Sequence, residues 1–240
     1  MGEQARCVKC TAPVCRSKDH YLDGPLGCPT REKAEVIKQA VLEYDKPEVW
    51  EFARQASIQE FECFMKLPEG TTARNPRVEE VVQFAKKMGY RKLGVAFCGG
   101  TTNEARILTE ILENRGFDVV SVMCKAGSTP REKIGITEEQ KPQGPGSYSP
   151  MCSPIAQAMI LNDAGVEFNI LVGLCVGHDS LFIKYAHAPV TVLIVKDRVF
   201  GHNPAAGLYL SGSYYRKLLR KEPVDSTVWR REFAIQPQQG

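Results

Sequence analysis

The sequence lacks any long hydrophobic run. Its longest nearly apolar stretch, 170–177, is far shorter than the roughly 20 residues that a membrane-spanning helix needs. No apolar segment follows the first residues, so a secretory signal is not expected either. An excess of one charge is also missing: 31 Lys and Arg face 28 Asp and Glu, which gives no electrostatic reason to expect a nucleic-acid partner. We therefore expect a cytoplasmic protein that binds neither membrane nor nucleic acid.

What the sequence does contain is a globular composition with many cysteines. Hydrophobic residues make up 43% and charged residues 25% of the 240 positions, which excludes a disordered chain, a collagen and a coiled coil. The nine cysteines are an odd number in a chain without an export signal. This combination indicates reduced thiols that serve metal binding or catalysis rather than a disulfide framework.

Four cysteines crowd into the first 28 residues, and Pro29 directly follows the last of them: Cys7, Cys10, Cys15 and Cys28. The segment is too rich in turn residues to bury a core, so a metal that bridges the thiolates would supply the free energy of folding. The second short cysteine hook of a usual zinc site is missing. Three close cysteines, a distant fourth and the proline favour a 4Fe–4S cluster instead. Zinc stays open, because both centres use four thiolates.

The rest of the chain predicts helices and then an alternation of strands and helices. Helical spacing of apolar residues covers 30–45, 47–65 and 75–88. Short apolar strands are expected at 93–98, 117–124, 169–175 and 190–195, each separated from the next by helical sequence, with a last helix from 203 to about 219. Cys63 falls in the second of the early helices and is interpreted as a core cysteine without chemistry.

This alternation predicts an α/β fold. We expect a parallel sheet of about four strands with helices on both faces, preceded by a helical segment and the cysteine-rich knuckle. The corresponding domains are a metal-binding knuckle at 1–30, a helical region at 31–90, the α/β domain at 91–222 and a tail at 223–240.

The predicted sheet brings four further cysteines to one place. Parallel strands end at the same edge, and ligands bind beyond those carboxyl ends. Cys98, Cys124 and Cys175 each close a strand, and Cys152 stands just before a helix whose N-terminus faces the same edge. One such cysteine would be an ordinary buried strand residue, but four at corresponding ends predict a site. His178 follows closely enough to serve there as a ligand or proton donor.

Other residues at this edge support a binding site. The small-residue turn 99–102 leads into a helix N-terminus, which is a ready anion site. Lys196, Arg198 and His202 follow the last strand, whereas Asp179 has an alternative role in neutralising its helix dipole. The loop 125–151 is rich in Gly and Pro and too long for a plain connector, so it is a candidate lid.

Three chemistries suit this cysteine-lined edge. The four thiols could bind a second cluster or metal. Alternatively, Cys152 could act as a nucleophile in thiol or persulfide chemistry, because a helix N-terminus lowers the pKa of a thiol. The third possibility is a metal-stabilised module that only binds a ligand or partner. A serine-type triad has no support, since the sequence has no G-x-S-x-G elbow.

Several stretches resemble a known family. They are the segment that begins Cys175-Val-Gly-His-Asp, the segment that runs from Lys196 to Pro204, and the N-terminal quartet that ends Cys28-Pro29. Together they resemble a cysteine-rich domain-of-unknown-function family regarded as metal-binding and found largely in anaerobic bacteria and archaea. The resemblance covers nearly the whole chain and implies metal binding at the N-terminal cysteines, but it implies no particular reaction.

The sequence thus predicts a metal-binding protein, with an iron–sulfur centre and with redox or sulfur-handling activity at the cysteine-lined edge. Cys152 and His178 are its candidate catalytic residues, and its partner would be a small molecule or a redox protein. The alternative is a zinc-stabilised ligand- or partner-binding regulatory module without catalysis. Neither the oligomeric state nor enzymatic turnover follows from the sequence.

Overall fold

The computed structural model describes residue 5 and residues 7–221. By its internal contacts the chain divides into two units. The first holds the chain up to Arg91 together with Arg115–Phe117, and the second holds Lys92–Asn114 and the chain from Asp118 onward. The predicted tail at 223–240 lies outside the described residues.

The first unit is helical with one small hairpin. Its elements are two 3₁₀ turns, η1 (Cys7–Lys9) and η2 (Val14–Arg16), then α1 (Pro29–Glu32), α2 (Ala34–Glu43), α3 (Pro47–Glu62), β1 (Phe64–Leu67), β2 (Gly70–Ala73) and α4 (Arg77–Lys87). The helix predicted over 30–45 is interrupted at Lys33, where φ is −120°. The helix predicted over 47–65 ends early, because β1 pairs antiparallel with β2 around a two-residue turn.

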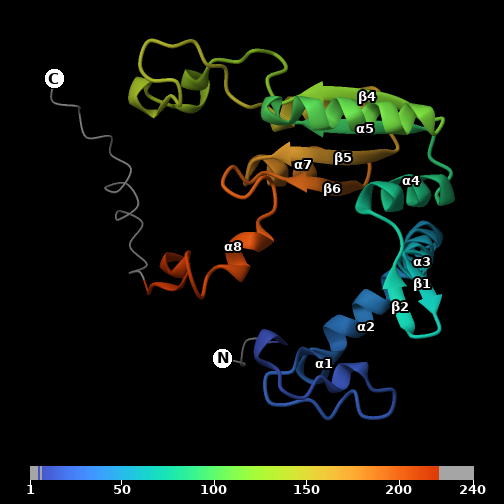
Figure 1. The fold of residues 1–240 in the computed structure, drawn as a ribbon. Coiled ribbons are helices and arrows are strands. Elements are labelled where there is room, and N and C mark those ends of the chain that lie inside the picture. The colour runs from blue at the N-terminus through green and yellow to red at the C-terminus, as the bar shows by residue number, and fades with distance from the viewer. Residues whose placement is uncertain (1–4, 6, 222–240) are drawn as a thin grey trace. The chain divides into compact units, whose positions relative to one another are not determined.

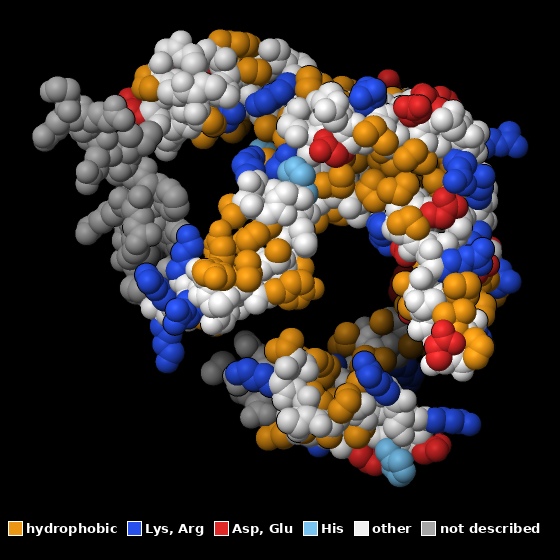
Figure 2. All heavy atoms as spheres, in the orientation of Figure 1, with side chains coloured by type: hydrophobic (Ala, Val, Ile, Leu, Met, Phe, Trp, Pro, Cys, Tyr) orange, Lys and Arg blue, Asp and Glu red, His pale blue; other side chains and the backbone are white. Residues whose placement is uncertain are grey.

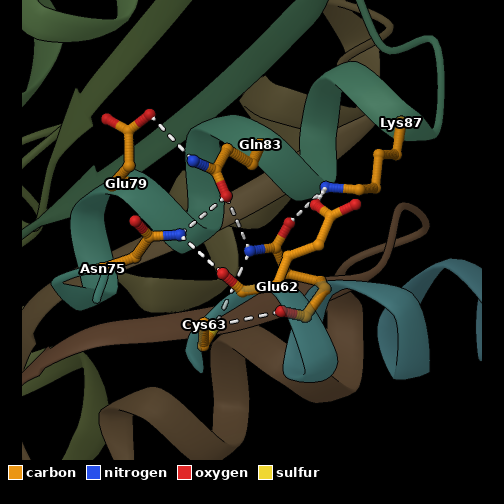
Figure 3. Close-up of polar contacts among 7 residues, drawn as sticks. Glu62, Cys63, Asn75, Glu79, Gln83 and Lys87 are labelled. Atoms are coloured by element: carbon orange, nitrogen blue, oxygen red, sulfur yellow. Dashed lines mark hydrogen bonds and ion pairs between the residues drawn. The ribbon is translucent and has the colours of Figure 1, made fainter. Parts of the chain in front are cut away.

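A polar network holds the end of α3 against α4 (Figure 3). The Gln59 amide donates to Gln83 Oε1 at 2.9 Å, and Lys87 Nζ donates to Gln59 Oε1 at 2.7 Å. Asn75 Nδ2 also donates to Gln83 Oε1, at 3.0 Å. Cys63 lies beside this network, half-buried, and its thiol donates to the Gln59 carbonyl at 3.0 Å. The cysteine that the sequence assigned to the core therefore sits at a helix end, in a structural hydrogen-bond network.

The second unit is built on a parallel sheet. The four strands are β3 (Lys92–Phe97), β4 (Asp118–Met123), β5 (Phe168–Leu174) and β6 (Val190–Val195), in the order β4-β3-β5-β6. All three neighbouring pairs are parallel (Figure 1). Every residue of β5 is buried, which explains its uninterrupted apolar run. The prediction of a four-stranded parallel sheet with alternating helices is confirmed.

Helices connect consecutive strands of this sheet. They are α5 (Thr102–Asn114) after β3, α6 (Pro154–Asp163) after β4 and α7 (His178–Tyr185) after β5. The step from β3 to β4 runs in one direction across the sheet, and the later steps run in the other. Right-handed crossovers therefore place α5 on one face and α6 and α7 on the opposite face. The α6–α7 face is closed by buried residues that include Ala158, Leu161, Leu171 and Phe182.

The reversal of direction creates a topological switch point between β3 and β5. The chain leaves β3 and β5 toward opposite sides of the sheet. In open α/β sheets, the crevice beyond the carboxyl ends at such a point is where ligands bind. Cys98 directly follows β3 and Cys175 directly follows β5, so both flank this crevice.

The long loop between β4 and α6 has structure of its own. It contains the 3₁₀ turns η4 (Arg131–Ile134) and η5 (Glu138–Gln140). An antiparallel bridge between Pro130 and Pro150 closes its base. Lys141 forms ion pairs with Glu132 and Glu138 within the loop. The loop therefore folds back on itself, and its role as a lid stays a prediction.

The prediction of one helix from 203 to about 219 is wrong. α8 (Ala205–Tyr209) is short, and turns lead from it to η6 (Arg216–Leu219). The sequence Ser211-Gly212-Ser213 explains the break, because these residues are weaker helix formers than alanine or leucine. Hydrophobic side chains gather over α8 in Figure 2. Leu208 and Tyr209 of this helix are exposed. Across 7–221, no helix is long and apolar enough to cross a membrane.

Candidate functional site

The hydrogen-bond ladder of the sheet continues one residue beyond the ends of β3 and β4, to the backbone of Cys98 and Cys124. Cys98 N donates to the Val172 carbonyl of β5 at 3.1 Å. Cys124 N donates to the Phe97 carbonyl of β3 at 2.9 Å. The backbones of Cys98 and Cys124 are therefore fixed by neighbouring strands rather than left to loops.

The other two edge cysteines are anchored where helices begin. Ser153 N donates to the Cys124 carbonyl at 2.7 Å, which fixes the start of α6, and Cys152 with it, to the end of β4. The Cys175 carbonyl accepts from His178 N at 3.0 Å, which forms the turn that begins α7. The structure therefore brings the ends of four separate segments to the carboxyl edge of one sheet, as predicted.

A glycine in β5 permits the close approach of the turn after Cys98. Thr101 is fully buried, and its hydroxyl lies 2.9 Å from the Val172 carbonyl and 3.0 Å from the Cys98 carbonyl. Gly173 has φ +68°, and a Cβ there would lie 2.5 Å from Thr101 Cγ2. Only glycine satisfies both the backbone angle and the contact. The register shift between β5 and β6 falls at the same place.

Three of the four edge thiols shift one another's pKa. Hydrogen bonding from Cys124 lowers the pKa of Cys98 to about 4, with help from the Gly100 amide. Hydrogen bonding from Cys124 likewise lowers the pKa of Cys152 to about 5. The pKa of Cys124 itself is raised, by Cys152 first, then by Cys98 and by burial. Cys124 therefore keeps its proton, and Cys98 and Cys152 carry the negative charge.

Each of these two thiolates has its own cation. A side chain at Gly100 would meet Lys196 Nζ at 3.4 Å and Cys98 Sγ at 4.0 Å, so the ammonium and the sulfur lie on the same side of the turn. The charges of Lys125 and His178 act on Cys152 and contribute to its lowered pKa. His178 is thus near the predicted catalytic cysteine, as its position in the sequence suggested.

Cys175 joins the group through an arginine. Arg198 Nη2 donates to Cys175 Sγ at 3.1 Å. This contact is the first cause of the raised pKa of Arg198, and the charges of Cys98 and Cys152 contribute further. Arg198 therefore lies within electrostatic reach of three of the four edge cysteines.

Sequence reasoning missed Gln157, whose side chain binds the strand ends that carry the site. Gln157 is fully buried on α6, and its Nε2 donates to the carbonyls of Phe97 and Val122 at 3.1 and 2.6 Å. Those carbonyls lie near the ends of β3 and β4, one residue before Cys98 and two residues before Cys124. The Gln157 Oε1 atom is buried without a hydrogen-bond partner. A glutamine inside the otherwise apolar segment 154–161 was the available signal.

Two other residues highlighted from the sequence, His202 and Asp179, have local roles, and so does Asp197. His202 Nδ1 accepts from Asp197 N at 3.1 Å, so the imidazole closes the turn after β6. The Asp197 carboxylate accepts from the amides of the two residues after Arg198. Asp179 Oδ1 accepts from Ser180 N at 2.7 Å at the start of α7, in agreement with its alternative reading as a helix-terminus residue.

The N-terminal cysteines lie in a segment without a core. Cys7, Cys10 and Cys15 are exposed and Cys28 is half-buried. Gly24 is the one buried residue among those described before α2. The amides of Arg31 and Thr30, at the start of α1, lower the pKa of Cys28. The thiols are thus available as ligands, and the described segment has almost no apolar burial to hold it together.

The cysteines do not form a ready metal cage. Among residue 5 and residues 7–221, no group of three or more His, Cys, Asp or Glu side chains is arranged to hold a metal ion. Four thiols remain the right donor chemistry for iron–sulfur or zinc. The metal assignments for both cysteine sets therefore stay predictions.

The fold and the site define a class of protein: a parallel α/β protein with a cysteine-lined edge at its switch point. The chain belongs to the family described as protein of unknown function (DUF1847), which matches residues 28–193. An uncharacterised protein of Methanocaldococcus jannaschii is 41% identical over 215 residues, which cover 89% of this chain and 98% of that protein. The expected membership of a family of unknown function is confirmed, whereas metal binding by the family is not shown.

Proposed function

We propose that this protein carries out redox or sulfur-handling chemistry with the thiols at the carboxyl edge of its sheet. The observation that carries the proposal is that Cys124, fixed by its backbone to the end of β3, lowers the pKa of both Cys98 and Cys152. Neighbouring thiols that share a proton are the arrangement from which thiolate attack and disulfide formation proceed. Lys125 and Lys196 stabilise the thiolate form that such chemistry needs.

The neighbours of each cysteine suggest its role. Cys152 stands at the start of α6 beside Lys125 and His178, which suits an attacking thiolate. Cys124 keeps its proton and suits the resolving thiol that attacks second. Once Cys152 is in a mixed disulfide it carries no charge, so the first cause of the raised pKa of Cys124 is removed and Cys124 can lose its proton. His178 is placed to donate a proton to a sulfur that leaves Cys152.

Mapping of disulfides tests this proposal. The anaerobically purified protein is treated with a small disulfide, and its cysteine-containing peptides are identified by mass spectrometry. We expect a disulfide between Cys124 and Cys152, and we expect Cys124→Ser to trap Cys152 as a mixed disulfide with the reagent. Cys63→Ser is the matched control and should behave as the unchanged protein. A mixed disulfide that accumulates equally with and without Cys124 would contradict the resolving role.

The N-terminal cysteines support a second proposal, an iron–sulfur centre at Cys7, Cys10, Cys15 and Cys28. The supporting observation is a described segment with four thiols and one buried residue. When bound, such a centre would supply cross-linking and electron transfer. Iron, zinc and acid-labile sulfide counted on one anaerobic sample test it. A brown protein that bleaches on reduction supports iron–sulfur, whereas one zinc per chain supports the zinc-stabilised binding module.

The same sample distinguishes the two possible uses of the edge cysteines. If Cys98, Cys124, Cys152 and Cys175 hold a second cluster, Cys152→Ser should remove about half of the iron and sulfide. If they are reactive thiols, the metal content should stay constant and alkylation at position 152 should be lost. The second outcome is the one that the proposal predicts.

A further inference from the structure

The surface formed by α8, η6 and the turn between them is both apolar and basic, and we call it the α8–η6 patch. Its large hydrophobic side chains are between 55% and 90% exposed: Leu208, Tyr209, Tyr214, Leu218 and Leu219. Its cations are exposed as well: Arg216, Lys217, Arg220 and Lys221. Figure 2 shows hydrophobic side chains over α8 and, beside them, Lys and Arg side chains over the segment that follows.

The α8–η6 patch is a folded surface, because Phe200 packs inside it. The Phe200 and Tyr215 rings lie 4.8 Å apart, centroid to centroid. A Cβ at the buried Gly207 of α8 would lie 3.1 Å from Phe200 Cε2, so the helix lies directly against this ring. The amides of Ser213 and Tyr215 both donate to the Leu210 carbonyl at 3.0 Å, which closes the turn after α8. Phe200 and Tyr215 thus form the inside of the patch, and its exposed side chains form the outside.

The charge of the patch is of one sign. The sequence from 198 to 221 contains no Asp or Glu. Arg216 Nε donates to the Ser213 carbonyl at 3.0 Å, and Lys217 Nζ lies 5.6 Å from the centroid of the Tyr215 ring. Neither contact neutralises a cation. The nearly balanced charge of the whole chain therefore conceals a local positive excess, which favours a partner with negative charge.

The exposure of the apolar side chains favours a membrane over an acidic protein. The side chains that dominate a protein–protein interface fill pockets of a matching surface. A bilayer interface, in contrast, accepts protruding side chains without a matching shape, and each hydrophobic side chain of the patch is more than half exposed. Leucine is stabilised below the headgroups and tyrosine at their level, while neighbouring cations attract anionic headgroups.

We propose that the α8–η6 patch binds the surface of a membrane that contains anionic lipids. Its leucine and tyrosine side chains enter the headgroup region, and its cations pair with lipid phosphates. This partner differs from the expectation drawn from the sequence, which rested on the lack of a long hydrophobic run and on the charge of the whole chain. Binding at the surface of a membrane requires neither a long hydrophobic run nor a large overall charge.

Co-sedimentation of the whole chain with lipid vesicles tests the proposal. One set of vesicles contains equal parts of phosphatidylglycerol and phosphatidylcholine, and the other contains phosphatidylcholine alone. Each cation near an anionic surface strengthens binding about fivefold, so we expect a preference of about 100-fold or more for the anionic vesicles at low salt. The preference should shrink to below about tenfold near 1 M salt, where the Debye length is about 3 Å.

A double substitution assigns the preference to the cations of the patch. Arg216→Gln/Lys217→Gln should weaken binding to the anionic vesicles about 25-fold. Arg106→Gln/Lys184→Gln is the matched control, because it removes the same charge from exposed positions on α5 and α7. This control should change binding by less than about twofold, since charges distant from the membrane are screened.

A second double substitution tests the apolar contact at constant charge. Leu208→Ala/Tyr209→Ala should weaken binding to the anionic vesicles about tenfold, because apolar area is no longer buried among the lipids. Both side chains are exposed, so the variant should keep the Tm of the unchanged protein. Polyglutamate serves as a soluble acidic competitor and should displace little of the bound protein.

Three results would overturn the proposal. The first is equal binding to the two sets of vesicles, or binding to neither. The second is a loss of binding in Arg106→Gln/Lys184→Gln as large as that in Arg216→Gln/Lys217→Gln. The third is full displacement by polyglutamate together with unchanged vesicle binding of Leu208→Ala/Tyr209→Ala, which would identify an acidic protein as the partner instead.

Discussion

The pH dependence of alkylation at Cys152 is the most direct test of the site. An ordinary thiol with a pKa of about 8.5 is roughly 50% ionised at pH 8.5 and about 0.3% ionised at pH 6, so its alkylation slows about 150-fold. Cys152, with a pKa of about 5, should stay more than roughly 90% ionised over the same range. Its rate should therefore change by about a tenth, and it should fall only as the pH approaches 5.

The measurement is iodoacetamide labelling at a series of pH values, with peptides quantified by mass spectrometry. Cys63 is the internal control, since burial and the nearby Glu80 raise the pKa of its thiol. The shape of the pH profile is the diagnostic quantity rather than the absolute rate. A thiolate of low pKa is intrinsically a weaker nucleophile, by about 25- to 55-fold for a pKa that is lower by about 3.5.

Two substitutions of Cys124 test whether its hydrogen bond is what lowers the pKa of Cys152. Cys124→Ala removes the donor, so the pKa of Cys152 should rise and its alkylation at pH 6 should slow severalfold. Cys124→Ser retains an O–H donor and should keep the profile close to the original. If Cys152 follows the same pH curve as Cys63 in the unchanged protein, the assignment of charge to Cys152 is refuted.

Four further outcomes are expected. Cys98 and Cys152 have lowered pKa values when folded, so their contribution to stability is present above about pH 8.5 and is lost as the pH falls toward 5. Chemical denaturation should therefore show that the free energies of unfolding of the protein and of the Cys98→Ser/Cys152→Ser variant become more similar as the pH falls, and a constant difference would contradict the shifts. Gly173→Ala should destabilise by about 1–3 kcal/mol or more, because φ is +68° and the new methyl would lie 2.5 Å from a side-chain carbon; an unchanged Tm would contradict the close approach. Gln157→Leu should cost about 1–2 kcal/mol in the same denaturation assay, because it removes the donor of two carbonyl contacts, and a gain in stability would mean that the unpartnered Oε1 dominates. Phe182→Ala should cost about 3–5 kcal/mol through the cavity that it leaves, whereas a loss below 1 kcal/mol would mean that the core collapses into the space.

Local pattern was enough to predict the strands of the second unit. β5 is buried on both sides, so its apolar run is unbroken, and helical sequence on either side requires a parallel crossover. The order β4-β3-β5-β6 was not predictable, because periodicity does not state which strands are neighbours. The hairpin of β1 and β2 was missed because Phe64 and Met65 continue the apolar pattern of α3 and only their pairing partners show that they form a strand.

The candidate site was predictable by position but not by charge. Cysteines at the ends of parallel strands had to meet at one edge, and that rule located Cys98, Cys124 and Cys175, whereas Cys152 was located by the helix that it precedes. Their division into a protonated Cys124 and ionised Cys98 and Cys152 depends on burial and on which sulfurs touch. Gln157 could not be assigned either, because its two acceptors lie on strands far away in sequence.

The strand order also determines when, during synthesis, the contacts around the reactive thiols can form. β3 pairs with β5, and Leu93 is synthesised roughly 4 to 15 s before its partner Phe168 leaves the ribosome. Cys98 and Cys124 are both in the nascent chain before Phe168 is, but Lys196, which also lowers the pKa of Cys98, directly follows β6 and is synthesised after β5. The full set of contacts that favours the Cys98 thiolate is therefore complete only when the last strand has been made.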